Sequence, residues 1–263
     1  MADASQRGRL VWFELMTTDL TAAERFYTTV VGWTITAFHG SPTGPYSMFT
    51  RPDGVPVAGG MALPPDLVSR HVPPNWMLYV GVASLDAVTA DAVRLGGQAL
   101  SPVIDVPTVG RMVTLADPQG AAFNVLEPAP SSQGQPEAPA RLGDVSWVEL
   151  MTTDAAAAMR YYTELFGWTT LEPMDMGPMG TYHMFGRPLG PLGGMMNKTP
   201  EMAQIPPYWG IYFRVDDIDA AKARVIDNGG QVVNGPMEVP GGDWIVNCLD
   251  PQGAGFSLHA AKA

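Results

Sequence analysis

The chain has 263 residues, of which 46% are hydrophobic and 16% are charged, so it can bury a sizeable core. Its formal net charge of −11 opposes binding to nucleic acid and to anionic membranes, because both need a basic surface. A single cysteine, Cys248, excludes an internal disulfide framework, and we expect a cytoplasmic protein without a signal peptide or a membrane span.

An internal repeat organises the chain. The stretch WFELMTTD that begins at Trp12 returns as WVELMTTD at Trp147, an offset of 147 − 12 = 135 residues. Four shorter motifs recur at 135 or 133 residues: Phe/Tyr-Tyr-Thr, Gly-Trp, Pro-Pro-x-Trp and Asp-Pro-Gln-Gly. This pattern predicts two copies of one unit, residues 1–127 and 141–263, joined by a Pro/Ser/Gln-rich linker at 128–140.

The elements of the first copy follow from period-2 patterns, turn residues and helix signals. A capping box at Thr21–Glu24 predicts a helix that ends before Gly32, and Ser84 starts a second helix that ends at Gly96. The second copy is expected to place helices at 155–166 and 218–228. Strands are expected at 10–16, 33–38, 46–50, 57–61, 77–82, 103–106, 112–115 and 122–126. We interpret the chain as an α+β protein with two tandem βαβββ modules whose mixed sheets curl around each other.

The alternation within strands indicates two different faces. In the first strand, Phe13 and Leu15 form an aliphatic face that should pack on helices, whereas Trp12 and Glu14 lie on the other face. A face that mixes aromatic, Met and polar groups suits the lining of a ligand cavity. The residues predicted to line such cavities are Trp12, Glu14, Tyr46, Met77, Tyr79, Asn124, Trp147, Glu149, Tyr182, Tyr212, Arg214 and Ser257.

Three residues are catalytic candidates: Glu14, Glu149 and His259. A carboxylate in the middle of an apolar strand is costly unless it is hydrogen-bonded. Glu14 and Glu149 could therefore orient a ligand or act as a general base, or they could make a structural hydrogen bond, which their presence in both copies favours. His259 should face the same side as Ser257, although a lone histidine is more often structural.

The order and spacing of the motifs resemble the vicinal oxygen chelate superfamily, which includes glyoxalase I, bleomycin-resistance proteins and extradiol dioxygenases. The resemblance rests on the Phe-Tyr of the first helix, the Gly-Trp after it, and the Asp-Pro-Gln-Gly before the last strand. It covers nearly the whole chain outside the linker. The tandem Glu-Leu-Met-Thr-Thr-Asp is similar to the two-module actinobacterial branch, whose members are labelled glyoxalase-like antigens or hydroxylases.

The resemblance implies three metal-ligand positions in each copy. They fall on Trp12, Met77 and Asn124 in the first copy, and on Trp147, Gly210 and Ser257 in the second. None of these is His or Glu, the side chains expected of a divalent metal site, so we predict no metal and no other cofactor.

The leading interpretation is a metal-independent protein that binds a hydrophobic or aromatic small molecule, as a monomer or a homodimer. It would serve in resistance or sequestration, or as an accessory in aromatic metabolite biosynthesis. Two alternatives stay open: a glyoxalase-like or dioxygenase-like enzyme of the same superfamily, and an interaction protein with vestigial cavities.

Overall fold

The computed structural model describes residues 7–261 except 43 and 131–137, and the predicted linker lies largely outside the described residues. Each repeat contains the β-α-β-β-β order twice, so it holds two βαβββ units. The sequence pattern predicts one such module per repeat. The first repeat comprises β1 (Leu10–Thr17), α1 (Leu20–Val30), β2 (Thr34–Phe38), β3 (Tyr46–Thr50), β4 (Pro56–Ala62), α2 (Pro65–Ser69), β5 (Asn75–Gly81), α3 (Leu85–Arg94), β6 (Gln98–Ala99), β7 (Ile104–Val106), β8 (Gly110–Ala116) and β9 (Ala122–Pro128).

The second repeat follows the same plan. It comprises β10 (Val145–Thr152), α4 (Ala155–Phe166), β11 (Thr169–Thr170), β12 (Met174–Asp175), η2 (Gly177–Met179), β13 (Thr181–Arg187), β14 (Gly190–Asn197), η3 (Pro200–Met202), β15 (Tyr208–Arg214), α5 (Ile218–Asp227), β16 (Gln231–Glu238), β17 (Trp244–Leu249) and β18 (Gly255–Ala260). The sheets are mixed: the first and last strands of each βαβββ unit are parallel, and the hairpin pairs within each unit are antiparallel. None of the helices described is long and apolar enough to span a membrane.

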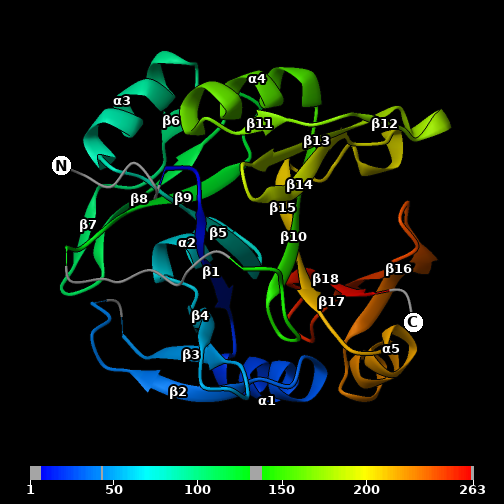
Figure 1. Ribbon diagram of the computed structural model, residues 1–263. Coiled ribbons are helices and arrows are strands. Elements are labelled where there is room, and N and C mark those ends of the chain that lie inside the picture. Colours follow the sequence, from blue (N-terminus) through cyan, green and yellow to red (C-terminus); the bar gives the residue numbers. More distant parts are fainter. Residues whose placement is uncertain (1–6, 43, 131–137, 262–263) are drawn as a thin grey trace. The chain divides into compact units, whose positions relative to one another are not determined.

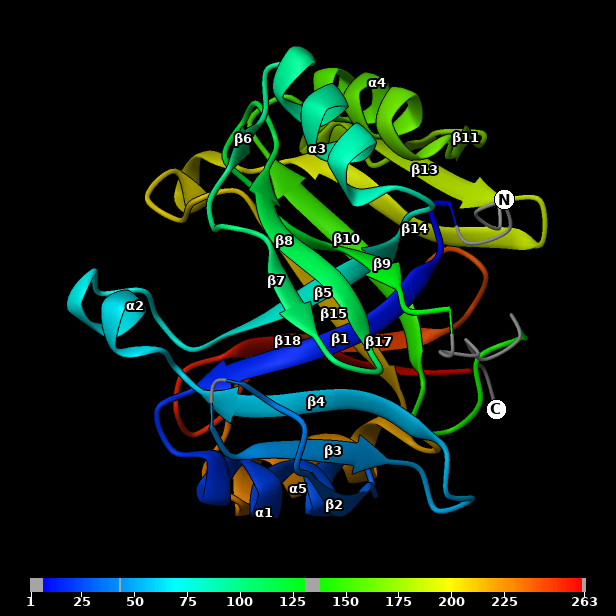
Figure 2. The ribbon, with the colours of Figure 1, turned by 90° about the vertical axis from the view of Figure 1, so that its left-hand side faces the viewer.

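The chain forms two compact units, and each unit takes one half of each repeat. The α1–α5 unit comprises Trp12–Met77, Ala138–Trp147 and Gly210–Ala263. The α3–α4 unit comprises Met1–Val11, Leu78–Glu137 and Val148–Trp209. Helix α1 lies beside α5 in the first unit, and α3 lies beside α4 in the second (Figures 1 and 2).

The helices begin as the motifs require, with one correction. Asp19 caps α1 and Asp154 caps α4; each side chain accepts a hydrogen bond at 2.9 Å from the backbone N–H three residues later. The predicted capping box at Thr21–Glu24 is therefore wrong. Glu24 instead accepts a hydrogen bond from Ser47 of β3, and so it ties α1 to the sheet.

A hydrogen-bonded chain links the two repeats inside the α1–α5 unit. Trp76 Nε1 donates to the Tyr27 hydroxyl at 2.8 Å, and this hydroxyl donates to Asp250 Oδ2 at 3.1 Å. Asp250 is 2% exposed, and it also accepts hydrogen bonds from the backbone of Gln252 and Ala254. Burial raises the pKa of the Asp250 carboxyl, and these donors oppose the rise.

The α3–α4 unit contains the same chain with the repeats exchanged. Trp209 Nε1 donates to the Tyr162 hydroxyl at 3.2 Å, which donates to Asp117 Oδ2 at 3.1 Å. In both units the tyrosine of one repeat thus reaches the Asp-Pro-Gln-Gly turn of the other. Trp76 and Trp209 are 4% and 5% exposed, so both are core residues.

The Gly-Trp motif makes a second reciprocal contact. Trp33 Nε1 donates to the Gly143 carbonyl at 2.8 Å, and Trp168 Nε1 donates to the Gly8 carbonyl at 2.7 Å. Gly8 and Gly143 have φ of +77° and +84°, the left-handed region that favours glycine. Each tryptophan therefore donates a hydrogen bond to the glycine of a β-bulge that belongs to the other repeat.

Two neighbouring tyrosines of α4 allow a matched test of this chain. Tyr162→Phe removes the partner of buried Asp117 and Trp209, so we expect a loss of about 1–3 kcal/mol in the free energy of unfolding. The Tyr161 hydroxyl has no hydrogen-bond partner among the described residues, and Phe26 stands at the matching position of the first repeat. Because Tyr161→Phe removes a buried hydroxyl that has no such partner and leaves no other group unsatisfied, it should not lower the free energy of unfolding. Urea unfolding of both variants measures this, and equal losses would contradict the proposed link.

Candidate functional site

The pairing of β1 with β4 decides which face of the first strand packs on α1. Leu15 pairs with Gly60, and Glu14 pairs with Gly59; paired residues of parallel strands point to the same face. A Cβ built on Gly60 would lie 3.1 Å from Leu20 of α1, so the Leu15 face packs on the helix. Glu14 therefore lies on the face turned away from α1.

A hydrogen-bonded triplet occupies the face turned away from α1. Trp12 Nε1 donates to the Tyr46 hydroxyl at 2.8 Å, and this hydroxyl is hydrogen-bonded to Glu14, which is 9% exposed. Burial, together with the charge of Glu14, raises the pKa of Tyr46 far above its ordinary value. The tyrosine therefore stays protonated and can satisfy the buried carboxylate. The structure thus brings together Trp12, Glu14 and Tyr46 of the predicted site.

Gly59 makes room for this triplet. A Cβ on Gly59 would lie 2.0 Å from the Tyr46 hydroxyl oxygen, so the ring sits directly over the glycine. The α3–α4 unit repeats the arrangement: Glu149 pairs with Gly194, whose Cβ would lie 2.1 Å from the Tyr182 ring. The glutamate, the glycine that pairs with it and the tyrosine above that glycine therefore occur once in each repeat.

The other two predicted residues of the α3–α4 unit pair with one another. Tyr79 of β5 pairs with Asn124 of β9, and each is 5% exposed. Thr114 donates to Asn124 Oδ1 at 2.7 Å, so this asparagine side chain is fixed in place.

A polar row lies on the matching face of the α1–α5 unit. Tyr212 pairs with Ser257 and Arg214 pairs with His259, so the four residues share one face of β15 and β18. Asn247 donates to Ser257 Oγ at 2.8 Å. The opposite face carries Phe213, which packs on Tyr27 of α1.

His259 stands in a cluster that the sequence did not predict. Its Nδ1 lies 2.8 Å from Ser146 Oγ, and its Nε2 lies 2.8 Å from Asp243 Oδ2. Arg214 approaches Asp243 at 3.5 Å. Burial is the largest influence on the pKa of His259 and lowers it; Asp243 opposes this, and Arg214 adds to it.

Ser146 and Asp243 were missed because neither belongs to a motif. A comparison of the repeats for positions that are polar in only one copy would have found Ser146, which stands where the first repeat has Val11. Met77 is buried and belongs, with Trp147, to the α1–α5 unit. Because the predicted residues are divided between the two units, their grouping into one cavity per repeat stays a prediction.

The residues at the implied metal positions do not fit a divalent metal. An indole, a thioether and a carboxamide held by Thr114 stand at Trp12, Met77 and Asn124. Trp147, Gly210 and Ser257 offer one hydroxyl, which already accepts a hydrogen bond from Asn247. Throughout the described ranges, no three His, Cys, Asp or Glu side chains are grouped as a metal site requires.

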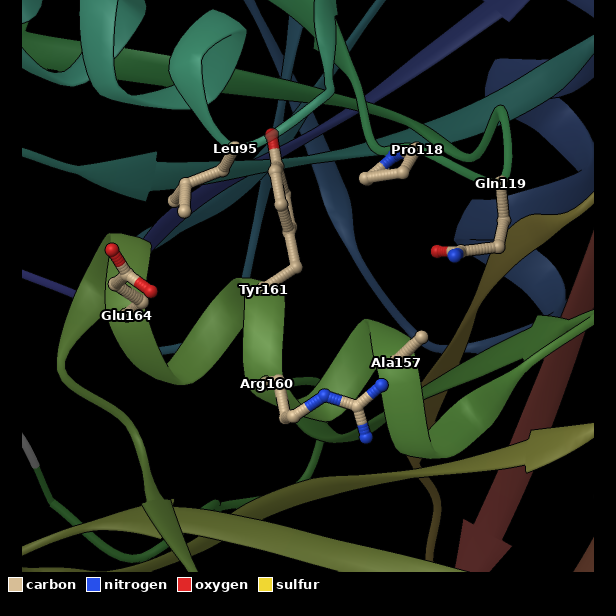
Figure 3. Close-up of a pocket in the computed structure, with 7 residues that line it drawn as sticks. All are labelled: Leu95, Pro118, Gln119, Ala157, Arg160, Tyr161 and Glu164. Atoms are coloured by element: carbon tan, nitrogen blue, oxygen red, sulfur yellow. The ribbon is translucent and has the colours of Figure 1, made fainter.

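A surface pocket of the α3–α4 unit lies elsewhere. It has a volume of about 380 Å³ and is lined by Leu95, Pro118, Gln119, Ala157, Arg160, Tyr161 and Glu164 (Figure 3). The Tyr161 ring rises from α4 toward Leu95 in this view. No residue of the predicted site lines this pocket, so we assign it no part in the function.

Comparisons with known proteins identify the family and agree with the fold. Residues 144–258 match the family described as the Glyoxalase/Bleomycin resistance protein/Dioxygenase superfamily, and residues 12–126 match a glyoxalase-like domain. A Mycobacterium tuberculosis protein named "Putative glyoxylase CFP32" is 34% identical over 261 residues, which cover 96% of this chain and 95% of the relative. The chain belongs to the glyoxalase/bleomycin resistance/dioxygenase superfamily.

A further relative of this superfamily protein is named for anthracycline biosynthesis. The "Anthracycline biosynthesis protein DnrV" of Streptomyces peucetius is 32% identical over 281 residues, which cover 95% of this chain and 92% of the relative. Solved structures share the fold at low identity. The Mn(II)-bound glyoxalase from Novosphingobium aromaticivorans has a TM-score of 0.63 at 14% identity, covering 98% of this chain and 83% of that one. The expected fold class is confirmed.

The glycine under Tyr46 provides a test of this triplet. Gly59→Ala should displace the tyrosine and break its bond to Trp12, at a cost of about 1–3 kcal/mol in unfolding free energy. Gly255→Ala is the control, because its Cβ would meet nothing nearer than Leu249 at 3.9 Å. Thermal unfolding compares the two; a Gly59→Ala protein as stable as the control would show that Tyr46 does not depend on this space.

Proposed function

We propose that this protein binds a flat aromatic small molecule without a metal, as a monomer or a homodimer. The observation that carries the proposal is the Trp12–Tyr46–Glu14 triplet on the sheet face turned away from α1. An indole offers a stacking surface, and a carboxylate held by a protonated phenol offers a fixed acceptor for a ligand hydroxyl. The single, buried Cys248 suits the reducing cytoplasm, where we place this binding.

The relatives support a role around aromatic metabolites. DauV of Streptomyces sp. strain C5 and DnrV are both named for anthracycline biosynthesis, and anthracyclines contain fused aromatic rings. We therefore propose an accessory role in the making of such a compound, or its sequestration as a resistance function.

The donor set argues for binding without a metal. Trp12, Met77 and Asn124 offer no anionic or imidazole ligand at the positions where the superfamily's metal would be held. This favours a binding protein over a glyoxalase-like or dioxygenase-like enzyme, whose chemistry would need that metal.

Fluorescence titration of chelator-treated protein with quinizarin, a dihydroxyanthraquinone, tests the proposal. We expect saturable tryptophan quenching that EDTA leaves unchanged. Trp12→Ala and Trp147→Ala should each weaken binding roughly 3- to 10-fold, because a ring contact contributes about 0.5–1.5 kcal/mol.

Trp244→Phe is the matched control for this titration. Trp244 is 37% exposed and shares its strand face with Val246, which pairs with core residue Leu258. Its loss should change the signal but not the affinity. Quinizarin affinity that is equal in all three variants, or that disappears with EDTA, would refute the proposed site.

A further inference from the structure

The second repeat carries a polar cluster that comes from four separate segments of the α1–α5 unit. Ser146 belongs to β10, Arg214 ends β15, Asp243 precedes β17, and His259 lies in β18. The side chains of Arg214, Asp243 and His259 are 21%, 35% and 15% exposed. They are sheltered, yet open enough for a ligand to reach them.

The hydrogen bonds fix the tautomer of His259. An ionised Asp243 can only accept, so the 2.8 Å contact places the ring proton on Nε2. Nδ1 of the neutral ring must then accept, so the single Ser146 hydroxyl proton goes to Nδ1 at 2.8 Å and not to the Tyr212 carbonyl, which lies 3.3 Å away. Arg214 Nη1 lies 3.3 Å from Nε2 but has only donors, so its favourable partner is Asp243 at 3.5 Å.

The first repeat shows that the fold does not need this cluster. The positions that match Ser146, Arg214 and His259 are Val11, Gly81 and Leu126, and Asp243 corresponds to Gly110. The strand pairing is the same in both copies: Gly81 receives a bulge hydrogen bond from Gly8, just as Arg214 receives one from Gly143. The polar residues therefore add something that the scaffold alone does not require.

We propose that this cluster binds the carboxylate of an aromatic acid at Arg214 and that His259 takes up a proton when the acid binds. The inference extends the proposed function, since Arg214 and His259 share one strand face with Tyr212 and Ser257, two residues of the predicted binding site. Arg214 supplies the cation that a carboxylate prefers.

The charges explain the coupling to protons. Without ligand, Arg214 and Asp243 balance each other and His259 is held neutral, because burial lowers its pKa. A bound carboxylate adds one negative charge beside the imidazole, which favours the protonated ring. The described side chains within hydrogen-bonding distance of the His259 ring nitrogens are Ser146, Arg214 and Asp243. Ser146 does not titrate, so Arg214 and Asp243 are the charged groups that act on the ring. Affinity for the anion should therefore rise as the pH falls.

Calorimetric titration of the full chain with 1-naphthoate and with its neutral amide, 1-naphthamide, tests the inference. We expect naphthoate to bind at least five-fold more tightly at pH 6 than at pH 8, while naphthamide shows no such change. Naphthoate stays ionised over this range, so the change must come from the protein. Titrations in two buffers of different ionisation enthalpy should reveal proton uptake with naphthoate alone.

Variants connect this behaviour to the named residues. His259→Gln should remove the pH dependence, and Arg214→Met should remove the preference for naphthoate over naphthamide. Arg224→Met is the matched control: it removes an arginine of α5 in the same unit that pairs with Asp216 at 3.4 Å, and it should keep both properties.

Equal affinities for acid and amide, no binding of naphthoate, or a pH dependence that persists in His259→Gln would each overturn the inference. A different result would contradict the proposed function: no binding of quinizarin at Trp12 and Trp147. Naphthoate binding that depends on Arg214 would survive that failure.

Discussion

The buried aspartate of the Asp-Pro-Gln-Gly turn is the constraint on which the structure depends. Asp117 and Asp250 are each 2% exposed, and a carboxylate at that depth is costly unless its oxygens are hydrogen-bonded. The turn supplies backbone donors, and the remaining donor is a tyrosine hydroxyl from the other repeat. In each compact unit, the aspartate of one repeat therefore depends on a tyrosine that the other repeat supplies.

This exchange decides which sheet faces are available for a ligand. Tyr27 with Trp76, and Tyr162 with Trp209, fill the helix-facing side of the sheets. The alternate residues of the strands are therefore left on the opposite side. Those residues are the glutamates, with their tyrosines over Gly59 and Gly194. The scaffold thus presents mixed aromatic and polar faces, and the two repeats differ in what they add to them.

Much of the fold could be predicted from the sequence because the repeat and the period-2 patterns are local signals. Helix α4 begins and ends at the predicted residues, Ala155 and Phe166, and the alternation of Glu14 with Leu15 gives the observed faces. The exchange between repeats could not be predicted. Each repeat has its own tyrosine and its own Asp-Pro-Gln-Gly turn at nearly the same spacing, 117 − 27 = 90 and 250 − 162 = 88 residues, so the sequence alone cannot say which pairs meet.

The candidate site was only partly predictable for a similar reason. The Trp12, Glu14 and Tyr46 triplet combines residues that occur in both copies, and duplication made them visible. Asp243 stands in a glycine-rich turn with no motif around it. Only the fold, which brings it within 2.8 Å of His259, identifies it as part of a cluster.

The central claim, that neither repeat completes its own core, can be tested by dividing the chain in the predicted linker. Residues 1–130 and 138–263 would be produced separately and together, and their association and thermal unfolding would be measured. The exchange of Tyr27 and Tyr162 predicts that the two pieces co-purify one to one and unfold cooperatively, whereas each piece alone aggregates or self-associates. Two monomeric pieces that each unfold in a sharp transition would contradict this account.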